Sequence, residues 1–242
     1  MRLIFVRHAD PNYEIDSLTA TGWEEARLVA ERIAKLDVKE FYVSPLGRAQ
    51  DTAGCTLELS NRTAMTLDWL REFPPKIHRP DCKEKTICWD WLPQDWMKEE
   101  RFYNRKEWLE LEAMKNSDVP TEYEKVSKGL DAVLADCGYV RDGNYYRVEK
   151  ANMDTLVFFC HFGVECVMLS HLLNVSPMIL WHGFCAAPAS VTTVYTEERR
   201  KGIASWRVSS FGDNSHLYAA GREPSFSARF CECYDNKNER HD

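Results

Sequence analysis

The sequence contains no long run of apolar residues, and this absence excludes several classes of protein. No apolar stretch approaches the roughly 20 residues needed to cross a bilayer. The N-terminus also lacks a basic region followed by a long apolar core and a cleavage site of small residues. Paired cysteine motifs are missing as well, because Cys231 and Cys233 form an isolated C-x-C, which is weak evidence for a zinc site. The nine cysteines, several of them in apolar runs, are typical of reduced thiols. We therefore expect a cytoplasmic protein with no membrane partner and no metal.

An excess of positive charge is absent too. The chain has 31 Lys and Arg against 38 Asp and Glu, a formal net charge of −7. Such a protein has no general attraction to nucleic acid, so we expect no nucleic-acid partner. To bind an anionic substrate it must build a local positive site against its own field. Single arginines therefore matter more here than any broad basic patch.

No internal repeat and no low-complexity linker divides the chain. Its 242 residues, 44% of them hydrophobic, are enough for one α/β domain with a substantial core. We therefore predict a single domain over residues 1–242. The polar segment 219–242 has no periodicity and is predicted to be a loose tail.

Short apolar runs alternate with helical patterns in the first third of the chain. RLIFV (2–6) is typical of a strand buried on both faces of a parallel sheet. Apolar residues then recur at helical spacing over 22–36, and EFYVS (40–44) and MTLDWL (65–70) are further strand candidates. TLVFFC (155–160) is a second strongly buried strand. This order predicts a mostly parallel sheet with helices on its faces.

The later part of the chain also contains patterns that predict helices and strands. The sequence predicts a helix over 121–138, a hairpin around Asp142-Gly143, and two strands over 190–198 and 202–212.

The alternation of predicted strands and helices stops at residues 73–120, which are rich in tryptophan and proline. Within this segment we predict one helix, over about 98–115. Long structured connections are often lids or binding loops, so we expect an insertion over one end of the sheet. Trp89, Trp91 and Trp96 fit an organic group packing beside a ligand, and they fit equally well a role in anchoring the insertion to the domain.

Polar residues follow three of the predicted strands. Arg7 and His8 come directly after the first strand, and His161 follows TLVFFC at the start of a helix. Arg48 lies in the first turn of the helix after EFYVS. Ligands of open α/β sheets bind beyond the carboxyl ends of the strands, so these side chains should meet at one edge. A single histidine after a strand is more often a packing residue, and Arg48 has the alternative of an ion pair with Asp51 or Glu72.

The ordered set of motifs resembles the histidine phosphatase superfamily, the phosphoglycerate-mutase-like enzymes. The matching segments are VRHAD, SLTATGWEEA, SPLGRAQDTA, Glu72 in LDWLREF, CHFG and, more weakly, FGDNSHL. The resemblance covers about residues 2–72 and 154–217 and leaves 73–120 uncovered. It implies an α/β fold, a three-layer α/β/α sandwich with a mostly parallel central sheet. The helical, aromatic insertion would then lie over the active-site edge.

Carried over to this chain, the resemblance implies a metal-independent phosphoric monoester hydrolase of the histidine acid phosphatase type that needs no cofactor. His8 would be the nucleophile and become transiently phosphorylated. Arg7, Arg48 and His161 would bind the phosphoryl oxygens, and Glu72 would protonate the leaving oxygen. These residue types suit the chemistry, because phosphoryl transfer depends on in-line positioning and on balancing charge on the equatorial oxygens.

The sequence departs from the family pattern at several positions. Ala9 stands where many members have glycine, Phe162 separates His161 from Gly163, and Glu14 stands where bisphosphate-processing members have asparagine. Asn12 is a candidate substitute as a substrate-binding residue. We expect hydrolysis of a phosphorylated small molecule, with a phosphomutase or a catalytically silent phosphate-binding module as the alternatives. The sequence predicts neither the substrate nor the oligomeric state.

Overall fold

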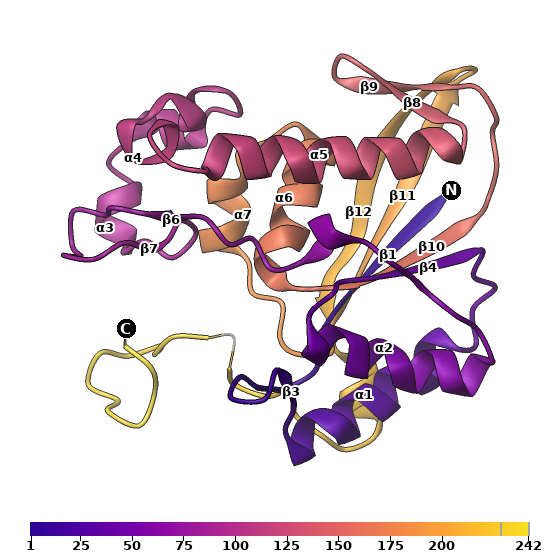
Figure 1. Ribbon diagram of the computed structural model, residues 1–242, viewed down its shortest axis with the longest axis horizontal. Coiled ribbons are helices and arrows are strands. Elements are labelled where there is room, and N and C mark those ends of the chain that lie inside the picture. Colours follow the sequence, from indigo (N-terminus) through magenta and orange to yellow (C-terminus); the bar gives the residue numbers. More distant parts are fainter. Residues whose placement is uncertain (228, 242) are drawn as a thin grey trace.

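An eight-stranded sheet forms the middle of the computed structural model, which describes residues 1–227 and 229–241 (Figure 1). The strand order is β5-β4-β10-β1-β11-β12-β9-β8. The parallel half contains β1 (Arg2–Arg7), β4 (Glu40–Val43), β5 (Met65–Thr66) and β10 (Thr155–Cys160). The antiparallel half contains β8 (Tyr139–Asp142), β9 (Tyr145–Val148), β11 (Val191–Arg200) and β12 (Ile203–Asp213). The predicted α/β fold is confirmed, with its parallel strands at one side of the sheet.

Strands β1 and β10 lie at the centre of the sheet because both are apolar along nearly their whole length. Alternate residues of β1 face opposite layers: Leu3 and Phe5 pack into one hydrophobic cluster and Ile4 and Val6 into the other. The two strands pair in parallel with Arg7 opposite Cys160. This register places the next residue of each strand at the same edge of the sheet.

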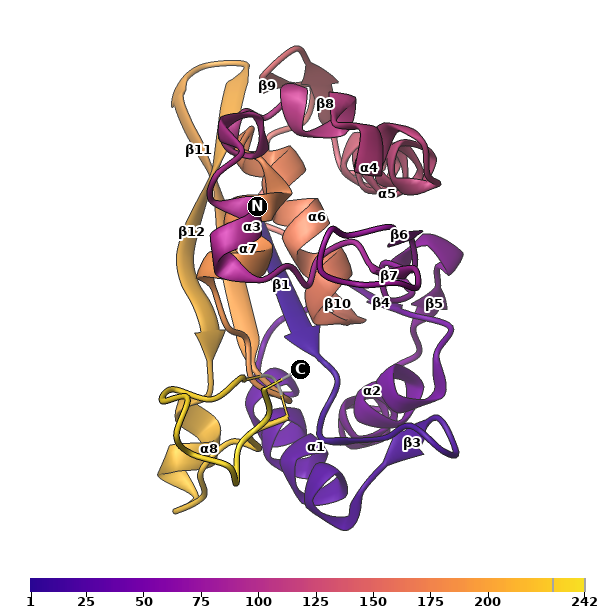
Figure 2. The same ribbon diagram turned by 90° about the vertical axis from the view of Figure 1, so that its left-hand side faces the viewer.

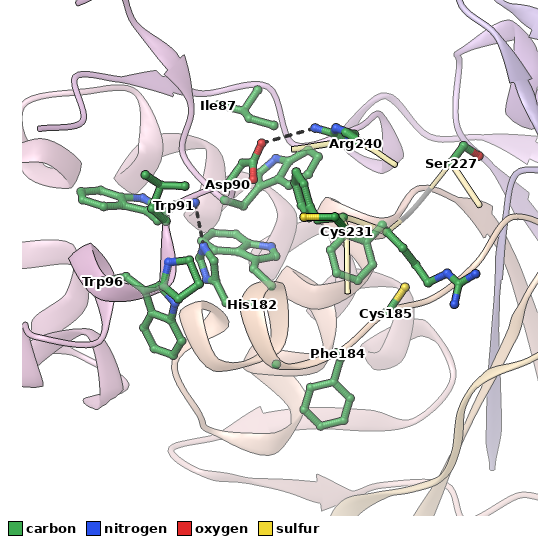
Figure 3. Close-up of a pocket in the computed structure, with 18 of the residues that line it drawn as sticks. Ile87, Asp90, Trp91, Trp96, His182, Phe184, Cys185, Ser227, Cys231 and Arg240 are labelled. Atoms are coloured by element: carbon green, nitrogen blue, oxygen red, sulfur yellow. Dashed lines mark hydrogen bonds and ion pairs between the residues drawn. The ribbon is translucent and has the colours of Figure 1, made fainter. Parts of the chain in front are cut away.

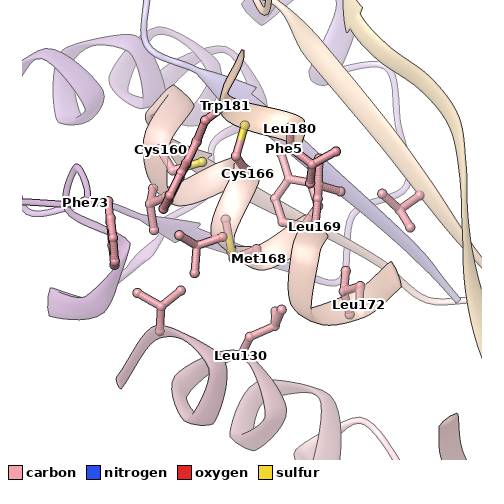
Figure 4. Close-up of a cluster of buried hydrophobic side chains, with 14 of the residues drawn as sticks. Phe5, Phe73, Leu130, Cys160, Cys166, Met168, Leu169, Leu172, Leu180 and Trp181 are labelled. Atoms are coloured by element: carbon pink, nitrogen blue, oxygen red, sulfur yellow. The ribbon is translucent and has the colours of Figure 1, made fainter. Parts of the chain in front are cut away.

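Helices cover both faces of the sheet, as three layers require. On one face lie α1 (Ala20–Ile33) and α2 (Gly47–Ser60), and on the other α5 (Val119–Asp136), α6 (Phe162–Leu173) and α7 (Pro177–Gly183) (Figure 1). α1 begins where Thr19 accepts a hydrogen bond from the Gly22 N–H, at 3.0 Å. The larger cluster packs α5, α6 and α7 against β1 and β10 and includes Phe5, Leu130 and Trp181 (Figure 4).

The insertion differs from its prediction. Over the predicted helix 98–115 the chain forms three short turns: η2 (Glu100–Tyr103), η3 (Glu107–Glu110) and α4 (Glu112–Lys115), preceded by α3 (Pro93–Trp96). The prediction of a single helix is wrong, because the backbone adopts an extended conformation at Asn104 and Leu111 and interrupts the helix there. The Asn104 side chain accepts a hydrogen bond from the Lys106 N–H at 2.9 Å, which offers the backbone an alternative to the helix.

Several other elements are short. The predicted strand 65–70 is reduced to Met65–Thr66, and η1 (Asp68–Leu70) takes up the rest. Two small hairpins join β2 (Pro11–Asn12) to β3 (Ser17–Leu18) and β6 (Lys76–Ile77) to β7 (Thr86–Ile87). Within the described residues, no helix combines the length and the apolar content that a bilayer crossing requires. No disulfide joins the nine cysteines, all of which are described.

The C-terminal segment runs back toward the start of the chain after α8 (Ser215–Ala219). In Figures 1 and 2 it lies at the α1 end of the molecule. The Ser225 N–H donates to Glu25 Oε1 at 3.1 Å, and the Ser225 hydroxyl donates to Asp10 Oδ1 at 2.5 Å. Residues 228 and 242 of the predicted tail lie outside the described residues. Ser225 and Ser227 both contact Asp10 in the loop that follows the first strand.

Candidate active site

His8 is the first residue after β1, and its imidazole is held in one orientation. The side chain is buried, with 2% of its surface exposed, and Nδ1 lies 2.8 Å from the Ala9 carbonyl oxygen. A carbonyl oxygen only accepts hydrogen bonds, so Nδ1 carries the proton and Nε2 keeps its lone pair. Burial, followed by the charge of Arg7, holds the pKa of His8 well below its usual 6.5. His8 is therefore neutral near pH 7, as a nitrogen nucleophile must be.

His161 occupies the matching position after β10. Its ring centroid lies 5.0 Å from that of His8, and its Nε2 lies 2.7 Å from the Ser44 hydroxyl. With Ser44 donating to Nε2, the proton sits on Nδ1, which is buried and has no partner among the described residues. Burial lowers the pKa of His161 well below 6.5. The neutral ring thus has one N–H available to a ligand oxygen.

Arg7 and Arg48 bring positive charge to both histidines. Arg7 donates to the Ala186 carbonyl, and its guanidinium lies 5.9 Å from the centre of the Phe162 ring. Arg48 pairs with Asp16 at 2.6 Å and lies 5.3 Å from the centre of the Tyr13 ring. Its ion-pair partner is therefore neither Asp51 nor Glu72. Each arginine keeps a buried Nε without a protein partner among the described residues.

The close contact between the Asp16 loop and α2 depends on glycine at position 47, which has no side chain. A Cβ on Gly47 would lie 2.0 Å from the Asp16 carbonyl oxygen. The Gly47 N–H also donates to Asp16 Oδ2 at 2.7 Å. Glycine at this position therefore lets Asp16 reach Arg48.

Glu72 follows the edge strand β5 and η1 and reaches the start of α6. Its carboxylate accepts hydrogen bonds from the backbone N–H groups of Phe73 at 2.8 Å, Val164 at 3.1 Å and Gly163 at 3.3 Å. Burial raises the pKa of Glu72 above its usual 4.5, although these hydrogen bonds and Arg7 act in the opposite direction. The group is thus poised to hold a proton at a higher pH than an exposed glutamate.

Gly163 makes this approach possible. A Cβ at this residue would lie 2.6 Å from Glu72 Oε1 and 3.0 Å from the Trp89 ring. Both contacts are too short for any side chain. Any side chain at this position would therefore push the Glu72 carboxylate away, although the φ angle there is an ordinary helical one.

Five of the predicted site residues come together and one does not. Arg7 and Arg48 are both close enough to His8, His161 and Glu72 to act on the pKa of each. Asn12 forms no hydrogen bond to these five side chains in the described part of the chain; its Oδ1 closes a local turn by accepting a hydrogen bond from the Glu14 N–H at 3.1 Å.

The structure adds supporting residues that the sequence analysis missed. The Thr52 hydroxyl accepts a hydrogen bond from the Ala9 N–H at 3.0 Å, which fixes the backbone beside His8. Glu165 is buried, and burial raises its pKa to about 7. Its acidic residue type inside the otherwise apolar run after His161 was a signal that could have found it. Ser44 and Thr52 lie within the recognised SPLGRAQDTA segment and could have been named from it.

A pocket of about 860 Å³ opens beside this group (Figure 3). Arg7 and Glu72 line its inner end, and tryptophans of the insertion, residues of α7 and the C-terminal segment line the rest. Among the described residues, no cluster of three or more His, Cys, Asp or Glu is arranged to hold a metal ion. The Sγ of Cys231, one member of the isolated C-x-C pair, lies 3.4 Å from Nδ1 of His241.

Comparison with known proteins identifies the fold and the family. The model of the histidine phosphatase superfamily (branch 1) matches residues 3–209. No curated protein sequence matches the chain significantly. A phosphoserine phosphatase mutant from Entamoeba histolytica in complex with phosphoserine has a TM-score of 0.58 at 20% identity, covering 89% of this chain and 98% of its own.

Two further structures are similar. A mycobacterial glucosyl-3-phosphoglycerate phosphatase complexed with VO3 has a TM-score of 0.54 at 19% identity, covering 87% of this chain and 98% of its own. The product of an open reading frame from Mycobacterium tuberculosis has a TM-score of 0.55 at 13% identity, with 87% and 96% covered. At these identities the structural likeness concerns the fold, whereas the family match spans most of the chain. The chain therefore belongs to the histidine phosphatase superfamily.

Proposed function

We propose that this protein hydrolyses a phosphate monoester through a phosphohistidine intermediate on His8. The observation that carries the proposal is the fixed tautomer of His8. Its Nδ1 is tied to the Ala9 carbonyl at 2.8 Å, so the lone pair of Nε2 is available beside two arginines. A neutral, oriented imidazole of this kind is what nucleophilic catalysis requires.

In the first step Nε2 of His8 attacks phosphorus in line with the ester bond. A P–N bond forms as the P–O bond to the alcohol breaks, and the proton of Glu72 passes to the leaving oxygen. Arg7, Arg48 and the Nδ1–H of His161 donate to the equatorial oxygens, whose charge they balance. The raised pKa of Glu72 suits a general acid working near neutral pH.

In the second step water attacks the phosphohistidine. Glu72, now a carboxylate, takes a proton from this water, the P–N bond breaks and inorganic phosphate leaves. Glu72 is then protonated again and His8 is neutral, so the cycle closes. The two guanidinium groups provide the positive charge at the phosphoryl oxygens, and we propose that neither a metal ion nor a cofactor takes part.

The structural relatives with named activities are phosphatases for phosphoserine and for glucosyl-3-phosphoglycerate. Their chemistry supports hydrolysis of a phosphorylated small molecule rather than transfer of the phosphoryl group within one substrate.

The test is hydrolysis of nitrophenyl phosphate with a metal chelator present. We expect turnover by the wild-type protein and none by His8→Ala, with the exposed His78→Ala as the matched control that keeps full activity. Reactions with radiolabelled substrate quenched in alkaline detergent, in which the P–N bond survives, should trap label on the wild-type and His78→Ala chains and none on His8→Ala. Loss of activity with chelator would refute the metal-free mechanism. Phosphate binding without turnover on any ester would show a silent binding module, and an isomerised product would show a mutase.

A further inference from the structure

The pocket beside Glu72 has an aromatic wall that the catalytic steps do not use. We propose that it binds the organic part of a small phosphate monoester whose alcohol carries an aromatic ring, in preference to small alcohols that carry a second acidic group. The inference rests on the proposed function, since the ester is the substrate of that reaction.

The aromatic wall begins where the proton is delivered. Gly163 separates the Glu72 carboxylate from the Trp89 ring, and a Cβ at Gly163 would be within 3.0 Å of both. The Trp89 indole is fixed by its Nε1–H, which donates to the Phe73 carbonyl at 3.0 Å. Its ring meets Phe162 edge-on, with centroids 6.2 Å apart. An alcohol oxygen protonated by Glu72 therefore carries its carbon substituent directly toward these two rings.

The wall continues as a fixed surface of neutral rings. Nε2 of His182 accepts a hydrogen bond from the Trp91 N–H at 3.0 Å, and its Nδ1 donates to the Met178 carbonyl at 2.8 Å (Figure 3). Burial lowers the pKa of His182 to about 4, so the ring is uncharged near neutral pH. Trp96 stacks on His182 with centroids 5.0 Å apart. A preformed aromatic surface binds a flat apolar group without first having to order its own side chains.

The cations of the pocket are already matched by acids. Apart from Arg7, the arginines that line it are each paired with a carboxylate. These pairs are Arg79–Asp81 at 2.8 Å, Arg229–Glu232 at 3.5 Å and Arg240–Asp90 at 3.6 Å. Asp90 itself lines the pocket (Figure 3). A second carboxylate or phosphate on the substrate would have to displace one of these acids, whereas an aromatic ring displaces none.

The size of the pocket favours a small molecule over a polypeptide segment. Its volume of about 860 Å³ lies within the range of roughly 300 to 1,000 Å³ typical of small-ligand sites. The side chain of a serine phosphate would leave most of this space, including the Trp96 and His182 wall, without contact.

Substrates with matched leaving groups test the proposal, because aryl esters are intrinsically more reactive than alkyl esters. We compare kcat/KM for phenethyl phosphate, ethyl phosphate and phosphoserine, all esters of primary alcohols. Burying a phenyl ring predicts at least about a tenfold preference for phenethyl phosphate over each of the others. Equal values, or a preference for phosphoserine, would overturn the proposal while leaving the phosphatase activity intact. No hydrolysis of any of them or of nitrophenyl phosphate would instead overturn the proposed function.

Variants of the aromatic wall test whether it is the source of the preference for phenethyl phosphate. Trp89→Leu should remove most of the preference for phenethyl phosphate and change ethyl phosphate hydrolysis much less. Trp23→Leu, which replaces a partly buried tryptophan of α1 outside the pocket, should keep the preference. Should Trp89→Leu fail to fold, Phe184→Ala replaces it, since this pocket residue is 45% exposed. Preference retained in both pocket variants would refute the assignment, as would faster hydrolysis of a phosphotyrosine peptide than of phenyl phosphate, since both of these are aryl esters.

Discussion

Replacing Gly163 by alanine should separate the catalytic role of Glu72 from the stability of the fold. The new Cβ would lie 2.6 Å from Glu72 Oε1 and 3.0 Å from the Trp89 ring. A carbon and an oxygen that are not bonded need well over 3 Å, so the carboxylate must retreat by roughly 0.5 to 1 Å. This movement breaks its hydrogen bonds with the Gly163 and Val164 N–H groups, which now measure 3.3 and 3.1 Å.

The expected loss is large for the reaction and small for the fold. General acid catalysis contributes about 10²- to 10⁴-fold to a rate, and a displacement of about 1 Å can remove about 10²-fold. We therefore expect Gly163→Ala to lower kcat/KM for ethyl phosphate by about 10²-fold. Alanine is the better helix former by about 1 kcal/mol, which offsets part of the strain in α6. The free energy of unfolding should fall by no more than about 2 kcal/mol.

The assay compares two leaving groups. Nitrophenolate leaves readily without a proton, so kcat/KM for nitrophenyl phosphate, which reports only the transfer of the phosphoryl group to His8, should fall by only a few-fold in Gly163→Ala. Gly54→Ala is the matched control: it also lies within a helix, its Cβ meets nothing within 4 Å, and it should stabilise the protein by about 0.5 to 1 kcal/mol with unchanged kcat. An unchanged kcat/KM for ethyl phosphate in Gly163→Ala, or equal losses of kcat/KM for both substrates, would refute the role of Glu72 as proton donor.

Three further changes test the electrostatics of the site. Because the pKa of His8 is lowered and that of Glu72 raised, kcat/KM for ethyl phosphate should be highest between these two pKa values and fall as Glu72 loses its proton at higher pH. Glu72→Gln should abolish that alkaline fall along with most of the activity. A profile that still falls the same way in Glu72→Gln would assign the fall to another group. Arg48→Lys should lower kcat/KM by about 10²-fold, since an ammonium does not donate two hydrogen bonds in fixed directions. The free energy of unfolding, measured by urea denaturation, should change by no more than about 1 kcal/mol, because Asp16, the ion-pair partner of Arg48, is 44% exposed. Burial raises the pKa of Glu165 from 4.5 to about 7, so the folded protein resists the loss of this proton. The free energy of unfolding of the wild-type protein should therefore fall by about 3 kcal/mol relative to that of Glu165→Gln as the pH rises from 4.5 to 7. If the two proteins gave parallel curves of stability against pH, this carboxyl would not be buried in solution.

The residues at the ends of the buried strands could be predicted from the sequence because their placement depends on local patterns. Apolar runs mark β1 and β10, and in parallel pairing the residues that follow two neighbouring strands share one edge. His8 and His161 therefore meet, with ring centroids 5.0 Å apart. The two central strands determine this contact without help from the rest of the chain.

Contacts between distant loops could not be predicted in the same way. Arg48 pairs with Asp16, 32 residues earlier, because Gly47 lets two loops touch, and no periodicity in the sequence indicates such a contact. The predicted helix over 98–115 failed for a related reason. Phe102, Trp108 and Met114 are all buried, yet their spacing of six residues would place them on three different sides of one helix, so these side chains reach the core from separate short turns. Tertiary packing overrides periodicity where a segment has little regular structure of its own.

The charge of the assembled site explains how an acidic protein can hold a phosphate ester. His8 and His161 are neutral because burial lowers their pKa values, and the raised pKa of Glu72 keeps its proton on to higher pH. Asp16, which lies at the surface, is the acid that pairs directly with Arg48. A phosphate monoester carries about two negative charges near neutral pH. Such a dianion matches two arginines better than the single charge of Asp16 does, so substrate binding competes with this ion pair rather than with a buried carboxylate. The net charge of −7 consequently lies outside the catalytic group, where it does not weaken the site's hold on the phosphoryl oxygens.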